Sequence, residues 1–154
     1  MKLNYWDMPK PAFIYAAIFV LANRLQALGD KIDATVTTKQ WLVLALISKF
    51  TASQPCIGEI AELLGTSRQN IKKIALILEK KGLLKMQKDK MDMRYIKLQL
   101  TPASYKLFDS RASQENEYLE RVFHGIDETT QKRLCEGLTK LLDNIERIEE
   151  NENH

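Results

Sequence analysis

The sequence has few of the residues on which disulfide-stapled, metal-binding and catalytic proteins depend. It holds two cysteines and two histidines in 154 residues. Cys56 and Cys135 cannot form the disulfide framework of a small secreted domain, so they point to a reducing cytosol. We find no metalloprotease, serine-hydrolase or phosphate-loop motif, and no motif partner near His124 or His154. The sequence therefore predicts a protein that is not an enzyme, with no metal site and no cofactor.

A long uncharged apolar run is also missing. The longest, Ala12 to Ala22, has eleven residues, which as a helix span about 17 Å against a hydrocarbon core of about 30 Å. The basic flank and small-residue cleavage site of a signal peptide are absent too. We therefore expect a cytoplasmic protein without a membrane partner, long enough to bury its own core.

Charge is divided unevenly along the chain. Residues 66–97 hold ten Lys and Arg against three Asp and Glu, whereas residues 109–154 hold six against twelve. A basic middle beside an acidic C-terminal part is typical of a protein in which one surface meets a polyanion. An ordinary solvated charged face is the alternative interpretation, and charge alone does not separate the two.

The apolar periodicity and the stop signals predict six helices. Thr37 with Gln40, and Thr66 with Gln69, are expected to form capping boxes at two of the starts, and Asp127 is expected to cap the last helix. The predicted helices cover residues 12–28, 37–47, 57–64, 66–81, 102–124 and 127–148. The end of the chain, residues 149–154, has the composition of a disordered segment.

Two short strands are expected between the fourth and fifth helices. Apolar and polar residues alternate over 84–88 and 94–100, and the polar segment 89–93 is suited to a hairpin loop. The fold class is thus mainly α, with a winged helix-turn-helix in residues 36–101. The flanking parts, residues 1–35 and 102–154, have apolar stripes that suit dimerisation helices.

The helix that opens at Thr66 and the following hairpin carry the side chains that reach bases and phosphates of double-stranded DNA. A recognition helix reads DNA with its N-terminal part, where most of these residues lie. An ordinary polar face is the alternative for an isolated helix, but the short preceding helix and the basic hairpin favour DNA binding. The candidate residues are Ser67, Arg68, Gln69, Asn70, Lys72, Lys73, Lys88, Lys90 and Arg94.

Three segments carry motifs of one known family: residues 57–65 (IGEIAELLG), Ser67 and Ile71 with residues 78–84 (LEKKGLL), and residues 89–94 (DKMDMR) with 98–101 (LQLT). In this order they resemble the first helix-turn-helix element, the recognition helix with its exit, and the wing of the multiple-antibiotic-resistance regulator (MarR) family. The resemblance implies a homodimer that binds a pseudo-palindromic operator, usually represses transcription by occlusion, and responds to a small, often aromatic, effector. Tyr15, Phe19 and Trp41 are conceivable effector-pocket residues, with plain core packing as the alternative.

The sequence departs from the family pattern at four positions. Met91 stands in the place of the first wing arginine, which in the family probes the minor groove, and Ser104 in the place of a common glycine. Leu76 and Ile77 replace residues that are commonly charged. These apolar replacements favour the rival interpretation, a winged helix that has lost DNA binding and docks a protein partner.

Cys56 occupies the cap position of the helix that begins at Ile57. A small residue that fills a cap is one interpretation. A redox sensor is the other, because the positive end of a helix stabilises a thiolate. Cys135 is expected to be an inert packing residue on the last helix.

Overall fold

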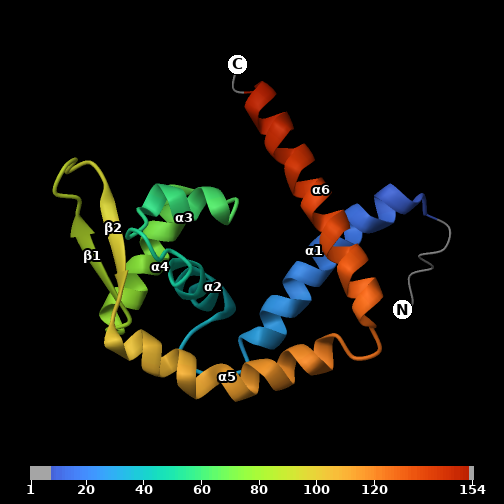
Figure 1. The fold of residues 1–154 in the computed structure, drawn as a ribbon, viewed down its shortest axis with the longest axis horizontal. Helices are drawn as coiled ribbons and strands as arrows, with labels where there is room; N and C mark the ends of the chain where they lie inside the picture. The colour runs from blue at the N-terminus through green and yellow to red at the C-terminus, as the bar shows by residue number, and fades with distance from the viewer. Residues whose placement is uncertain (1–7, 153–154) are drawn as a thin grey trace. The chain divides into compact units, whose positions relative to one another are not determined.

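The computed structural model describes residues 8–152, which form helices and one small sheet (Figure 1). The chain divides after Glu115 into two compact units. The mainly α class and the winged helix predicted from the sequence are confirmed. The elements are α1 (Lys10–Gly29), α2 (Thr38–Ile47), α3 (Ile57–Leu63), α4 (Arg68–Lys80), β1 (Leu84–Lys88), β2 (Ile96–Leu100), α5 (Pro102–Val122) and α6 (Glu128–Glu152).

Local hydrogen bonds set the helix starts. At α2 the predicted capping box is confirmed, since the N–H of Gln40 donates to Thr37 Oγ1 and the N–H of Thr37 donates to Gln40 Oε1, both at 3.3 Å. The box expected at Thr66 is wrong. The N–H of Thr66 is used in the preceding turn, where it donates to the carbonyl of Ala61 (2.9 Å). Ser67 caps α4 instead.

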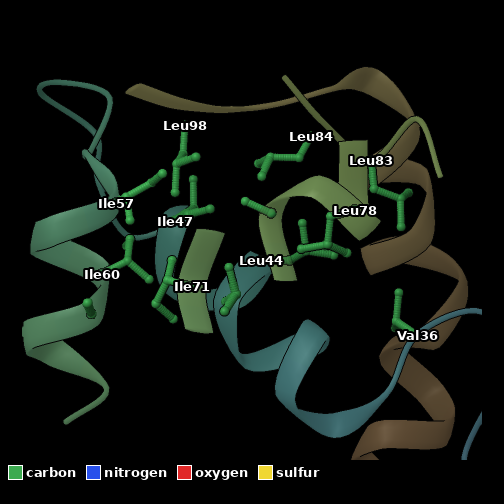
Figure 2. Close-up of a cluster of buried hydrophobic side chains, with 13 residues drawn as sticks. Val36, Leu44, Ile47, Ile57, Ile60, Ile71, Leu78, Leu83, Leu84 and Leu98 are labelled. Carbon is green, nitrogen blue, oxygen red and sulfur yellow. The ribbon is translucent and has the colours of Figure 1, made fainter. Parts of the chain in front are cut away.

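One apolar core holds α2, α3, α4 and the hairpin together (Figure 2). The stripe predicted in α4 is confirmed at Ile71, Ala75 and Leu78, which are all buried, while Ile74 is half-buried at the margin. Leu44 of α2 and Leu98 of β2 are also fully buried. The core contains side chains from α2, α3, α4 and both strands, which together form the winged lobe, residues 36–101. It therefore fixes α4 against the hairpin.

The two strands pair antiparallel, with Leu84 opposite Leu100 and Lys88 opposite Ile96. The second strand begins two residues later than predicted. The N–H of Tyr95 donates to the carbonyl of Asp92 (3.0 Å), and this turn keeps Arg94 and Tyr95 in the loop.

The first helix, α1, begins two residues earlier than predicted, because Pro11 fits a first turn, where its missing N–H is not needed. Most of its large apolar side chains are exposed. Its 20 residues are long and apolar enough to cross a membrane by length and composition, which the eleven-residue run did not indicate. Length therefore does not separate a membrane helix from a helix that packs on another subunit.

The second unit contains the end of α5 and all of α6. Asp127 caps α6 as predicted, since its Oδ1 accepts the N–H of Thr130 (2.8 Å), and this hydrogen bond lowers the pKa of Asp127. The helix continues to Glu152, so disorder from residue 149 is wrong up to that point; residues 153 and 154 lie outside the described residues. Six large apolar side chains are exposed along α6, and each has another of the set three or four residues away: Leu134, Leu138, Leu141, Leu142, Ile145 and Ile148.

Candidate nucleic-acid interface

A tight turn places the start of α4 beside α3. Gly65 has a positive φ of 58°, a conformation that glycine adopts without strain. Ser67 then caps α4 by accepting the N–H of Asn70 (3.1 Å). The buried side of α4 is anchored in the core, so its first turns are held with their polar side toward solvent. Gln69, Lys72 and Lys73 are exposed there.

Three of the predicted cations come together in one groove. Arg68 and Lys72 of α4 and Arg94 of the wing line a hollow of about 550 Å³ between α3, α4 and the start of β2. Gln69 lines it as well, and Glu59 and Glu62 of α3 form part of its wall. The groove therefore has a basic side on α4 and the wing, and an acidic side on α3.

Gly58, which has no side chain, lets Arg68 approach α3. A Cβ atom at Gly58 would lie 3.3 Å from Nε of Arg68 and 3.6 Å from the central carbon of its guanidinium. The arginine thus packs against the first turn of α3. Because it leans toward α3, its charge belongs to the groove as much as to the outward face of α4.

The wing cations differ in their surroundings. Lys88 ends β1 and Lys90 lies in the loop, and both are exposed. Arg94 is instead paired with the carboxylate of Asp92, with Nη2 2.6 Å from Oδ2 and Nε 3.0 Å from Oδ1. This pairing raises the pKa of Arg94 and lowers the pKa of Asp92. The charge of Arg94 is therefore partly offset, which the sequence pattern did not indicate.

The base-reading candidates at the start of α4 also make local bonds. Asn70 Nδ2 donates to Thr66 Oγ1 (3.0 Å), so one of its two amide hydrogens is used inside the turn. The prediction that Asn70 pairs with an adenine therefore depends on its second amide hydrogen and its carbonyl oxygen.

Cys56 is among the residues that line the groove and is 8% exposed. Its backbone N–H donates to Glu59 Oε2 (2.6 Å), and this hydrogen bond lowers the pKa of Glu59. A carboxylate therefore already occupies the positive end of α3. Cys135, expected to pack, is exposed on α6.

Comparisons with known proteins point in one direction. No model of a protein family matches the sequence. The chain is 26% identical over 141 residues to the transcriptional activatory protein BadR of Rhodopseudomonas palustris. The matched region covers 89% of this chain and 81% of that protein. Among solved structures, a MarR/EmrR family regulator from Acinetobacter sp. ADP1 superposes with a TM-score of 0.77 at 19% identity, covering 91% of this chain and 99% of that one.

Two further structures were solved with partners. MepR of S. aureus, in a complex with DNA, matches with a TM-score of 0.73 at 20% identity over 84% of this chain and 97% of that one. PcaV of Streptomyces coelicolor, in complex with its natural ligand, matches with a TM-score of 0.74 at 16% identity over 93% and 97%. The chain has the fold of the MarR-family regulators.

Within this MarR fold the aromatic candidates fall in two places. Tyr15 and Phe19 are neighbours on α1, with ring centroids 5.1 Å apart, and both are exposed. Trp41 on α2 instead meets Phe108 of α5 edge-on at 5.1 Å. Their grouping in one effector pocket stays a prediction.

A buried polar network around Trp41 was missed from the sequence. Arg111 of α5 is 3% exposed; its guanidinium lies 4.2 Å from the Trp41 ring centre, and its Nη1 lies 3.0 Å from Oδ2 of Asp33. Trp41 Nε1 donates to Glu115 (2.6 Å). Within residues 8–152, Nε of Arg111 is buried without a hydrogen-bond partner. The network ties α5 to α2 and to the segment between α1 and α2.

The same network stabilises the ionised form of the Asp33 carboxyl group. Burial alone would raise its pKa, but hydrogen bonds from Thr35 and the nearby Arg111 guanidinium outweigh burial and lower the pKa below its ordinary value of 3.8. No local signal could have revealed this ion pair, because its partners are 78 residues apart.

Ser104 shows how the MarR fold accommodates one departure. The residue is fully buried, and its hydroxyl donates to the carbonyl of Leu83. Thr101 likewise donates to the carbonyl of Gly82 (2.7 Å). These bonds tie the start of α5 to the exit of α4, so the serine is satisfied where the family often has glycine.

Proposed function

We propose that this chain is a sequence-specific transcriptional regulator that binds double-stranded DNA as a homodimer, at a pseudo-palindromic operator in the cytoplasm. The observation that carries the proposal is the groove that gathers Arg68, Lys72 and Arg94 beside the exposed face of α4. A helix on a packed core that presents cations and amides is suited to the major groove. Half-sites would then lie about one helical turn, 10–10.5 bp, apart.

The test begins with selection of bound fragments from the source genome, followed by anisotropy titrations at several salt concentrations. With roughly six to ten phosphate contacts, affinity is expected to fall about 10³- to 10⁵-fold between 50 and 200 mM salt. Two exposed lysines, Lys72 on α4 and Lys132 on α6, give a matched pair of variants. Lys72→Ala should flatten the salt dependence, whereas Lys132→Ala, with the same loss of charge, should leave it unchanged.

The roles within the site can be separated on a panel of operator variants. We expect Arg68→Ala or Asn70→Ala to cost about 1–3 kcal/mol and to relax selectivity at one base position. Lys90→Ala should instead weaken all sequences about equally, since a phosphate contact carries no sequence information. If both kinds of variant behave alike on the panel, this assignment of roles is wrong.

The dimer part of the proposal is supported by apolar surfaces that the chain does not cover. In α1, Ile14, Ile18 and Leu21 are exposed, and α6 exposes the row of leucines and isoleucines given above. Exposed apolar patches of this extent favour a second subunit. Sedimentation should show a dimer at micromolar concentration. A stable monomer that floats with phosphatidylcholine vesicles would show that α1 enters a membrane.

A small aromatic effector forms the third part of the proposal, supported by the likeness to PcaV, which was solved with its natural ligand. In a Trp6→Phe variant, Trp41 is the single tryptophan. Benzoate, phenol and indole can then be titrated against its fluorescence and against DNA binding. A ligand that changes both at the same concentration supports the proposal; one that changes neither does not.

We propose repression by occlusion, while BadR is by name an activator. The position of the selected operators separates the two. Sites that overlap the promoter support repression, and sites upstream of it support activation.

The alternative function is a winged helix that docks a protein partner. Leu76 and Ile77 favour it, since both are exposed on α4 among the basic residues. Failure of every genomic fragment to bind, together with a flat salt response, would favour this alternative.

A further inference from the structure

The loop of the wing, residues 89–95, joins β1 to β2 (Figure 1) and is folded by its own hydrogen bonds. Oδ1 of Asp89 accepts the backbone N–H groups of Met91 (2.7 Å) and Asp92 (3.1 Å). The N–H of Asp89 donates to the carbonyl of Tyr95 (2.9 Å), which closes the loop. The tip is therefore shaped before any partner binds.

That shape presents Met91 to solvent. Its side chain is 96% exposed, the highest value for any large apolar side chain among the described residues. Because it buries almost no surface, it contributes almost nothing to the stability of the lobe. Methionine is unbranched, flexible and polarisable, so it adapts to irregular apolar surfaces. The folded loop thus holds an apolar side chain in solvent, where it does not contribute to the core.

The charges around the tip point to the kind of surface it meets. Arg94 is paired with Asp92 (2.6 Å), and Lys97 lies 3.9 Å from Asp89, so the charges within each pair partly offset each other. Lys88 and Lys90 remain as exposed cations on the arm of the hairpin that leads into Met91. An apolar side chain beside exposed cations matches an apolar surface that is bordered by negative charge. The minor groove of DNA is such a surface, with sugars and base edges between the phosphate strands.

We propose that Met91 is a specificity-determining wedge that enters the minor groove beside the site of α4 and favours duplexes with an easily unstacked step there. The proposal rests on the DNA binding proposed above and assigns part of its selectivity to the wing. A thioether has no donor hydrogen, so it cannot read the acceptors of the groove floor. It gains contact by parting bases, which costs least at the pyrimidine–purine steps TA and CA/TG.

The test uses the full-length protein and a fragment selected by the wild type. Each base step that flanks the contacted half-site is changed in turn from TA to the stiff step AA, and binding is measured by anisotropy. At one flanking position the wild type should lose roughly 5- to 100-fold, the range of a single unfavourable base pair. Met91→Ala should remove that difference between TA and AA, and Met91→Leu, which keeps an apolar wedge, should retain it. A 2-aminopurine at the step should brighten on binding wild type and stay quenched with Met91→Ala.

Met93 supplies the matched control, since it is a second exposed methionine (68%) in the same loop. Met93→Ala should keep the preference for TA. Met91→Arg should steepen the logarithmic salt dependence by about 0.9 per wing and shift the preference to narrow A-tracts. If wild type binds DNA but Met91→Ala weakens all flanking sequences equally, the wedge is refuted and the proposed function stands. If wild type binds no duplex at all, the proposed function itself fails.

Discussion

Leu78 in α4 and Leu138 in α6 occupy similar positions in amphipathic helices, yet the first is 0% exposed and the second 50% exposed. The same contrast holds for whole regions. The winged lobe from Val36 to Thr101 closes a core from five elements, whereas α1 and α6 leave most of their apolar side chains uncovered. The lobe thus has a closed core of its own, while α1 and α6 each expose a large apolar surface.

Charge follows the same division. The basic residues gather on the lobe and the acidic ones on the C-terminal helices. A region that is folded by its own core can use its surface for a ligand, and a region that lacks cover is suited to assembly. Substitutions in the two regions should therefore have different effects on stability and on assembly.

Removal of Arg111 is expected to have the largest effect on stability. In Arg111→Met, Asp33 and the Trp41 face lose a buried cation, and the loss of one partner of a buried ion pair costs about 3–5 kcal/mol. Chemical denaturation of the lobe measures this. The double variant Arg111→Met/Asp33→Asn should lose less than the sum of the single variants, because it leaves no unpaired charge. Additive losses would show that the pair does not act as a unit.

The same pair predicts a response to acid. The folded-state pKa of Asp33 lies below its ordinary value of 3.8, so its contribution is present above that value and is lost as pH falls through the folded-state pKa. Between pH 5 and pH 2.5 the wild type should therefore lose more unfolding free energy than Asp33→Asn. Parallel curves for the two proteins would contradict the lowered pKa.

Truncation of the two leucines compares the regions directly. Leu78→Ala leaves a cavity in a closed core and should cost about 2–5 kcal/mol of unfolding free energy. Leu138→Ala, with the same change on an uncovered helix, should leave unfolding of the lobe unchanged and weaken dimer formation in sedimentation. A large loss of lobe stability in Leu138→Ala would break the contrast.

These differences also explain what could be predicted from the sequence. The capping box at Thr37 and the strand alternation depend on neighbouring residues, so pattern reasoning located α2 and the hairpin. Pairing of Arg94 with Asp92 depends on how the loop closes, and the Arg111–Asp33 pair joins residues 78 apart. The first pair is set by the backbone conformation of the loop, which the residue types alone do not fix, and the second arises from tertiary packing, which no local pattern records.

A smaller effect is expected at the helix caps. Ser67 accepts the N–H of Asn70 at the start of α4, and Asp127 accepts the N–H of Thr130 at the start of α6. Substitution of either cap by alanine should cost its helix about 1 kcal/mol of stability. Ser67→Ala should lower both the unfolding free energy of the lobe and the affinity for DNA. Asp127→Ala should leave both unchanged, as measured by chemical denaturation and by anisotropy titration. Equal loss of DNA affinity in both would show that the two regions are coupled more strongly than the contrast implies.

The smallest effect is expected at Cys56. The residue lines the groove between α3, α4 and the wing but is only 8% exposed, so an oxidant has little access to its thiol. The positive end of α3, which would favour a thiolate, already holds the carboxylate of Glu59, bound to the N–H of Cys56 at 2.6 Å. We therefore expect peroxide to leave DNA binding unchanged in wild type and in Cys56→Ser, which keeps a good helix cap. Cys135 is exposed and serves as the reactive control in thiol labelling. Loss of DNA binding in peroxide-treated wild type but not in Cys56→Ser would make Cys56 a redox sensor, because its adduct would displace the turn of α3 against which Arg68 packs.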